Sequence, residues 1–267
     1  MSFPILSKSS KSTARHNRAL IVSVEKFSAR AGLEKRPGTK RDTKRLHAAL
    51  SRRGFLVKIL MDPDADEIIE AFKAESEQSV HSCFVGVLSS HGDNGVIFGS
   101  DGRPVKLAQI YSQFGGPNMA AKNKLFLVQA CRGSELDDGV ETDTSEDCGR
   151  CEYQCEYQSI PCDTVVAYAT VPGYSAFMHP SGSVFIQTFC DLVEECEGWE
   201  ITQFLTRLNR RVAFKFEARG NELKGKKEMP CFISRLTADC YPFTNTLRVS
   251  ATELLQGTHT TRKNSIS

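Results

Sequence analysis

Two side chains that together could carry out nucleophilic chemistry, a thiol and an imidazole, each follow a run of apolar residues. Cys131 comes after Lys124-Leu-Phe-Leu-Val-Gln129, and His91 comes after a run that begins at Cys83. Such short runs predict buried strands, and a buried strand holds the residue just past its end in a fixed position. Parallel strands bring their carboxyl ends to one edge of a sheet, where open α/β folds place their sites. The sequence therefore predicts that Cys131 and His91 meet at one sheet edge.

The chemistry open to this pair is acyl transfer to the sulfur. A free thiol with a pKa of about 8.5 is only a few per cent thiolate at neutral pH, so a nearby imidazole helps by stabilising the thiolate or by moving its proton. A single cysteine is more often a small buried hydrophobe, and a single histidine is more often a satisfied core or surface residue. The two residues favour catalysis only when they are taken together with the residues around them.

Strands and helices alternate over about 110 residues of the chain, which predicts a largely parallel sheet flanked by helices. The expected strands cover residues 18–24, 55–60, the run before 91, 124–129, 164–169 and 230–236. One expected helix ends near residue 53, and the others cover residues 63–79, 107–114, 183–196 and 201–216. A hairpin is expected at 95–102. The fold class is therefore α/β.

The composition is that of an ordinary globular chain. It has 267 residues, of which 40% are hydrophobic, and a net charge of +2, which fits one sizeable domain or two small ones. No stretch approaches the roughly 18 to 20 apolar residues of a membrane span, and the N-terminal residues lack the apolar part of a signal peptide. We expect a protein of the cytoplasm, with the nucleus as a second location, whose ten cysteines are reduced.

Residues 30–53 hold nine Lys or Arg side chains against two acidic ones. A solvated helix face explains this stretch best, because no aromatic residues are interleaved to stack on bases. A surface for nucleic acid or anionic membrane is the alternative. We expect neither nucleic acid nor a membrane as a partner.

The motifs Ser90-His-Gly92 and Gln129-Ala-Cys-Arg-Gly133, in this order on successive strands, resemble those of the caspase family. The resemblance runs from about residue 16 to 243 and includes Val171-Pro-Gly-Tyr174, Gly182-Ser-Val-Phe-Ile-Gln187 and Pro230-Cys-Phe-Ile233. It is nearest to the short-prodomain, epidermal or keratinocyte-type members. The resemblance implies a three-layer sandwich with a six-stranded, mostly parallel sheet, and a cysteine endopeptidase that cuts proteins after aspartate.

The same resemblance implies roles for residues near the two strand ends. His91 would protonate the leaving amine, and the backbone N–H groups of Gly92 and Cys131 would form the oxyanion hole. The substrate aspartate would be held by Arg36 and Gln129. A carboxylate that leaves water needs such charged, bidentate partners.

The sequence departs from the family at the second arginine of the aspartate pocket. That aromatic-arginine pair reads Phe177-Met178 here, and Val184 stands where many caspases carry tryptophan. Three interpretations stay open: weak aspartate cleavage through Arg36 with help from His179, a shifted specificity, or a caspase-like dimer partner with little turnover. A realigned loop that supplies another basic residue is a fourth.

The expected organisation has five parts. These are a short flexible lead at 1–17, a large catalytic region at 18–133, a linker at 134–160, a small region at 161–243 and a disordered tail at 244–267. The resemblance implies a zymogen that is cut in the linker after Asp143, with Asp147 as a second candidate. It also implies a homodimer, or a heterodimer with another caspase, through the strand at 230–236.

The linker contains Cys148, Cys151 and Cys155, with Cys162 beyond it. Cysteine pairs two residues apart can hold zinc. A local duplication explains the spacing more simply, because Cys-Glu-Tyr-Gln occurs twice in succession at 151–158. We expect no metal and no other cofactor.

Overall fold

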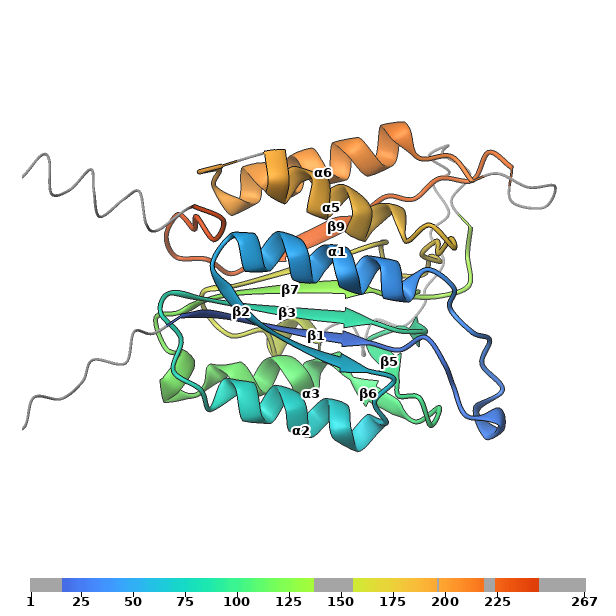
Figure 1. Ribbon diagram of the computed structural model, residues 1–267, viewed down its shortest axis with the longest axis horizontal. Coiled ribbons are helices and arrows are strands. Elements are labelled where there is room, and N and C mark those ends of the chain that lie inside the picture. The colour runs from blue at the N-terminus through green and yellow to red at the C-terminus, as the bar shows by residue number, and fades with distance from the viewer. Residues whose placement is uncertain (1–15, 137–155, 196, 219–223, 245–267) are drawn as a thin grey trace, which may run out of the picture.

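A six-stranded sheet between two layers of helices forms the centre of the molecule (Figure 1). The computed structural model describes residues 16–136, 156–195, 197–218 and 224–244. The sheet has the strand order β2-β1-β3-β7-β8-β9. Its strands are β1 (Asn17–Ser23), β2 (Phe55–Met61), β3 (Cys83–Ser89), β7 (Asn123–Gln129), β8 (Thr164–Tyr168) and β9 (Cys231–Ser234). All neighbouring pairs are parallel except β8 and β9, which confirms the expected mostly parallel sheet.

The central strands are apolar on both faces because helices cover both faces. Every residue of β3 is buried, as are all residues of β7 after Asn123. Continuous apolar runs of this kind are typical of parallel strands that are covered on two sides. This burial explains why these two strands were recognisable as short apolar runs without alternation.

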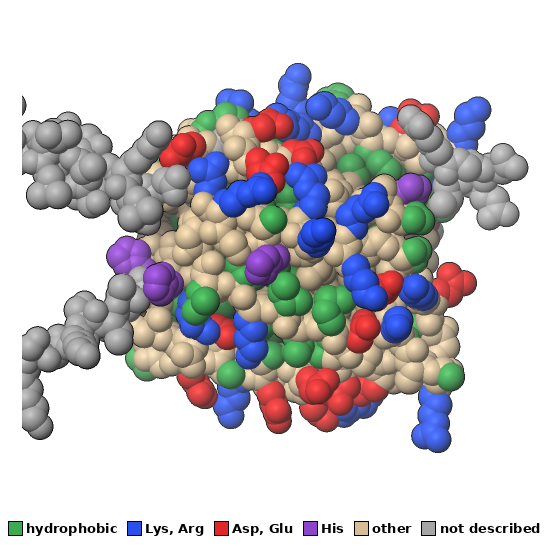
Figure 2. All heavy atoms as spheres, viewed as in Figure 1, with side chains coloured by type: hydrophobic (Ala, Val, Ile, Leu, Met, Phe, Trp, Pro, Cys, Tyr) green, Lys and Arg blue, Asp and Glu red, His purple; other side chains and the backbone are tan. Residues whose placement is uncertain are grey.

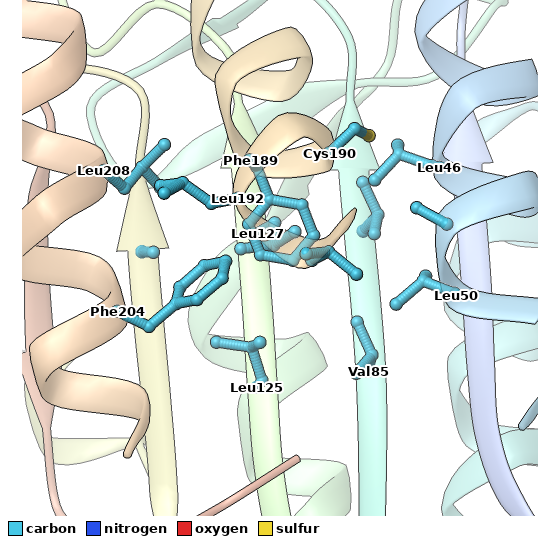
Figure 3. Packing of buried hydrophobic residues seen from close by; sticks show 14 of the residues in the cluster. Leu46, Leu50, Val85, Leu125, Leu127, Phe189, Cys190, Leu192, Phe204 and Leu208 are labelled. Carbon is cyan, nitrogen blue, oxygen red and sulfur yellow. The ribbon is translucent and has the colours of Figure 1, made fainter. Parts of the chain in front are cut away.

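Three helices, α1 (Thr39–Arg52), α5 (Val184–Glu195) and α6 (Ile201–Lys215), cover one face of the sheet (Figure 1). Their apolar side chains point at those of the strands in Figure 3. The labelled residues of this cluster are Leu46, Leu50, Val85, Leu125, Leu127, Phe189, Cys190, Leu192, Phe204 and Leu208. The second layer contains α2 (Ala65–Ser76) and α3 (Leu107–Ser112), which close a separate cluster on the opposite face.

Several expected boundaries differ in detail, and the strand expected at 230–236 is the shorter β9, Cys231–Ser234. The helix expected from residue 63 begins at Ala65, because Asp64 caps it: the Asp64 side chain accepts from Glu67 N–H, and the Glu67 side chain accepts from Asp64 N–H. The expected hairpin is part of a small antiparallel sheet of three strands, β4 (Gly92–Asp93), β5 (Val96–Phe98) and β6 (Pro104–Lys106). Pro63 therefore precedes the helix, and β4 begins directly after His91.

The described chain also contains three short 3₁₀ turns. They are η1 (Ala29–Ala31), η2 (Gln113–Gly115) and η3 (Pro117–Met119). Within the described ranges, no helix is long and apolar enough to cross a bilayer. The six cysteines that the structure describes are not joined in disulfides.

The basic side chains of α1 lie beside acidic ones. Figure 2 shows Lys and Arg side chains over α1 with Asp and Glu side chains next to them. Arg45 pairs with Asp191 at 2.8 Å, and Arg52 pairs with Glu194 at 2.9 Å, so both pairs link α1 to α5. This mixture of charges favours the solvated helix face over a surface for polyanions.

Candidate active site

His91 and Cys131 occupy equivalent places after neighbouring parallel strands. The last register pair of β3 and β7 is Ser89 with Gln129, and each functional residue follows two positions later. Ser90 N–H donates to the Gln129 carbonyl at 3.3 Å, which extends the pairing past the strand ends. A Cβ atom added to Gly92 would lie 2.9 Å from the Cys131 carbonyl oxygen. The two segments are therefore in contact at the carboxyl edge of the sheet, as the sequence predicted.

The His91 ring is held in one orientation and one tautomer. Its Nε2 atom lies 2.8 Å from the carbonyl oxygen of Glu34, and the ring packs on Phe27 with 5.0 Å between ring centroids. A carbonyl oxygen can only accept, so Nε2 carries the hydrogen and Nδ1 carries the lone pair. Burial lowers the pKa of His91 below its usual value of 6.5. The ring is therefore neutral at pH 7 and is able to accept a proton at Nδ1.

The Cys131 sulfur is half-buried under the loop that follows β8. The Ala176 N–H donates to Sγ at 3.4 Å, and the Ala176 carbonyl oxygen lies 3.7 Å from the same sulfur. Ala176 therefore both stabilises the sulfur through its N–H group and occupies space directly in front of it. A substrate peptide that reacts at Sγ has to approach along this loop.

The backbone after Cys131 is tied to the same loop. Arg132 N–H donates to the Tyr174 carbonyl at 3.0 Å, and Gly173 N–H donates to the Arg132 carbonyl at 2.7 Å. Gly133 has a φ of 149°, and a Cβ atom there would lie only 2.2 Å from the Gly173 carbonyl oxygen. Only glycine fits this close approach of two backbones. This explains the glycine that ends the motif around Cys131.

Arg36 is buried and donates to four protein oxygens. Its guanidinium contacts the Val24 carbonyl at 2.8 Å, the Ser89 hydroxyl at 3.2 Å, the Gln129 carbonyl at 3.3 Å and the Thr39 hydroxyl at 3.5 Å. Burial lowers the pKa of Arg36 to about 10, and Coulombic interactions with Cys131 and Asp42 oppose that fall. Arg36 therefore stays protonated at pH 7 and places a positive charge near the sulfur.

The other expected substrate residues lie around Phe177. Gln129 Nε2 donates to the Phe177 carbonyl at 3.4 Å, and the Phe177 ring packs on Phe216 with 5.1 Å between centroids. Met178 is half-buried, and Val184 begins α5 and packs against the helical core. Arg36, Gln129 and Phe177 are thus brought together beside Cys131. The expected processing residues, Asp143 and Asp147, fall outside the described residues, as do Cys148, Cys151 and Cys155.

Sequence reasoning missed Glu228, which lies behind Phe177. The side chain is 1% exposed, and its Oε2 atom accepts from Phe177 N–H at 2.6 Å. Burial raises its pKa from 4.5 to about 8. Its sequence neighbours are Lys226 and Lys227, so the segment is typical of a surface turn before the last strand. No signal in the pattern marks a buried acid there.

Asp42 was also missed, and it anchors the far end of the same loop. Its carboxylate accepts from the N–H of Ser183 at 2.9 Å, from the Ser183 hydroxyl at 2.8 Å and from Gln187 Nε2 at 2.5 Å. These bonds join α1 to the first turn of α5 across 141 positions in the chain. A contact between residues so far apart in the chain gives no local sequence signal.

Sequence reasoning also missed an ion pair that connects Arg132, the residue after Cys131, to Glu156 in the expected linker. Arg132 Nη2 pairs with Glu156 Oε2 at 3.4 Å, and the guanidinium carbon lies 4.0 Å from the centre of the Tyr168 ring. Tyr168 donates to Glu156 Oε1 at 2.6 Å. Glu156 is 1% exposed and Ile160 is fully buried, so the end of the expected linker is packed into the molecule.

Comparisons with known proteins agree with the fold. Residues 16–241 match the family described as Caspase domain. The chain is 38% identical to caspase-3 of Mesocricetus auratus over 232 residues, which cover 83% of this chain and 82% of that protein. It is 34% identical to caspase-7 of Gallus gallus over 236 residues, which cover 84% of this chain and 76% of that protein. The crystal structure of caspase-1 from Spodoptera frugiperda superposes with a TM-score of 0.76 at 27% identity, and covers 87% of this chain and 93% of that one.

Proposed function

This chain belongs to the caspase family and is a cysteine-type endopeptidase, and from that premise we propose that it cuts proteins after aspartate, at a reduced rate. The observation that carries the proposal is the His91 tautomer. Nε2 is bound to Glu34, so the lone pair of Nδ1 is free to act at the strand end beside Cys131. A base with a free lone pair beside a thiol is the arrangement that nucleophilic catalysis requires.

The proposed reaction begins with transfer of the Cys131 thiol proton to Nδ1 of His91. The thiolate then attacks the carbonyl carbon of the cut bond, and the N–H groups of Gly92 and Cys131 stabilise the negative oxygen. The His91 imidazolium returns the proton to the leaving amine, the C–N bond breaks, and a thioester stays on Cys131. Water then hydrolyses the thioester and regenerates the thiol.

The reduced rate follows from Met178. In the family pocket a second arginine holds the substrate carboxylate, and a thioether cannot do so. Removing one partner of a desolvated charge pair costs about 2 to 5 kcal/mol, which corresponds to roughly thirty-fold to several thousand-fold in rate. Arg36 would still bind the substrate carboxylate and so retain the remaining part of the interaction.

We also propose that the chain is made as a zymogen and cut after Asp143 or Asp147. The contacts of the Ala176 N–H and C=O groups with Cys131 Sγ support this, because the loop would have to move before a substrate could reach the sulfur. The proposed dimer would form through β9, which among the described residues pairs on one side only, with β8. Strand edges that are open in this way can pair with a second chain.

A second candidate is a regulatory partner that binds other caspases and turns over little substrate. Met178 favours it, because a weakened pocket would lower turnover while leaving β9 intact. The two candidates differ in whether Cys131 reacts as a nucleophile.

The test is incubation of the full chain with an acyloxymethyl ketone peptide that ends in aspartate, followed by mass spectrometry. An adduct on Cys131 that is absent from Cys131→Ala supports the endopeptidase. Absence of any adduct, with aspartate and with other terminal residues, contradicts it and favours the regulatory partner.

A further inference from the structure

The loop that covers Cys131 is held on its other side through one residue, Phe177. The N–H and C=O groups of Ala176 both reach Cys131 Sγ, at 3.4 and 3.7 Å. Those of Phe177 instead reach two buried side chains: Glu228 Oε2 accepts from its N–H at 2.6 Å, and Gln129 Nε2 donates to its carbonyl at 3.4 Å. Successive residues of an extended chain alternate in this way. Fixing Phe177 on one side therefore fixes Ala176 over the sulfur on the other.

The contact with Glu228 is the stronger of the two that hold Phe177. Its donor–acceptor distance of 2.6 Å is short for an N–H···O bond, whereas the 3.4 Å of the Gln129 contact is near the long limit. The Glu228 side chain is 1% exposed, so water does not compete for its oxygens. Removing this acceptor would leave the Phe177 N–H group without its partner and would weaken the covered position of the loop.

Glu228 occupies this position at a cost to the fold. Its second oxygen, Oε1, is buried and has no hydrogen-bond partner among the residues that the structure describes. Burial raises the pKa of the carboxyl to about 8, so at pH 7 the group is neutral, with its proton on Oε1 and its carbonyl oxygen Oε2 accepting from Phe177. A buried acid with one open oxygen is unfavourable for stability. The bond to Phe177 is the interaction that this acid supplies in return.

The segment that carries Glu228 also holds the side chain of Phe177. The Phe216 ring packs on the Phe177 ring with 5.1 Å between centroids. Lys227, the neighbour of Glu228, donates from Nζ to the Phe216 carbonyl at 3.3 Å. The ring and the N–H group of Phe177 are thus held by residues that are bonded to each other, so a movement of this segment would be passed on to Ala176.

We propose that Glu228 is a positioning residue of the peptidase: it holds Phe177 so that Ala176 covers Cys131, and release of this bond uncovers the sulfur for a substrate. The inference rests on the proposed role of Cys131 as the nucleophile and adds the residue that controls access to it. Glu228 acts through the loop backbone, and the chemistry stays with His91 and Cys131.

The experiment measures how well reagents of two sizes reach Cys131. The full chain is treated at about pH 7 with N-methylmaleimide or with the bulkier, uncharged N-pyrenylmaleimide, and the adduct at each cysteine is followed by mass spectrometry. Both reagents react with the same thiolate, so the ratio of their rates cancels its ionisation and reports access. The exposed Cys162 gives the ratio for an open thiol, and the buried Cys83 and Cys190 stay unmodified in a folded chain.

Four variants separate the hydrogen bond from the bulk of the side chain. Glu228→Met keeps the length of the side chain without its strong acceptor, Glu228→Ala removes both, and Glu228→Gln keeps the acceptor. The matched control is Glu70→Leu, at an exposed position of α2.

In the wild type we expect a lower bulky-to-small ratio at Cys131 than at Cys162. Loss of one buried hydrogen bond should raise the ratio at Cys131 by at least about fivefold in Glu228→Met and Glu228→Ala. Glu228→Gln and Glu70→Leu should stay within about twofold of the wild type.

Equal ratios at Cys131 and Cys162 in the wild type overturn the inference, because the sulfur would then be uncovered already. So does an unchanged ratio in a folded Glu228→Met or Glu228→Ala chain, or an equal rise in Glu228→Gln. These readings do not depend on turnover. Failure of Cys131 to react with the peptide ketones would instead refute the proposed function itself.

Discussion

Replacing Glu228 with glutamine is expected to remove a pH-dependent loss of stability. Burial raises the pKa of Glu228 from 4.5, its usual value, to about 8 in the folded chain. Between these values the folded chain holds a proton that the unfolded chain has released, so the free energy of unfolding falls as pH rises. The stabilising contribution is complete below pH 4.5 and is lost as pH approaches about 8.

The size of the effect follows from the shift. Each pKa unit corresponds to about 1.4 kcal/mol, so the wild-type chain should lose about 3 kcal/mol by pH 7 and at most about 5 kcal/mol by pH 8. Glutamine does not ionise, and its oxygen still accepts from Phe177 N–H. Its buried NH2 group adds an offset that does not change with pH. The difference between the two chains therefore isolates the titration of one carboxyl.

The assay is urea unfolding of the wild type, Glu228→Gln and the exposed control Glu70→Gln at about pH 5, 7 and 8.5. Protein concentration is held constant, because self-association changes apparent stability. The free-energy difference between wild type and Glu228→Gln should grow steadily in favour of the variant as pH rises. If that difference stays constant to within about 1 kcal/mol across the range, the pKa of Glu228 is not raised in the folded chain.

Three further changes test other parts of the site. Met178→Arg should raise kcat/KM for an aspartate peptide by at least about tenfold, because it restores a charged partner for the substrate carboxylate. An unchanged kcat/KM would mean that residue 178 does not reach the substrate carboxylate. Gly133→Ala should abolish labelling of Cys131 by a peptide ketone, because the added Cβ atom would lie 2.2 Å from the Gly173 carbonyl oxygen. The control Gly32→Ala, at a position with open space around it, should preserve labelling. Glu156→Ala should lower the free energy of unfolding by about 3 to 5 kcal/mol, because it removes the buried carboxylate that pairs with Arg132. The exposed control Glu197→Ala should have little effect. Equal urea midpoints for Glu156→Ala and the wild type would contradict a stabilising role of the pair.

The parts of the site that the sequence predicted are those with a local signal. Buried parallel strands appear as short apolar runs, so β3 and β7, and hence the adjacent segments that carry His91 and Cys131, followed from periodicity and topology. The glycine after Cys131 followed from the motif, and the structure adds the reason, which is the close approach of Gly173.

The parts that could not be predicted depend on contacts between distant segments. Asp42 looks like one more charged residue on an exposed helix, yet it is 2% exposed and binds the start of α5. Glu228 lies in a run of charges, and only the loop at Phe177 shows that it is buried. A single sequence does not show which charged residue another segment will cover, because burial is decided by tertiary packing.

The buried pair between Arg132 and Glu156 has a consequence for a chain that is cut in its middle. Glu156 lies downstream of Asp143 and Asp147, so a cut at either residue leaves Arg132 on one fragment and Glu156 on the other. The strands β7 and β8, which are paired in the interior of the sheet, would also belong to different fragments. The nicked protein should therefore behave as a heterodimer whose halves complement each other and co-elute in native buffer, and only denaturant should separate them.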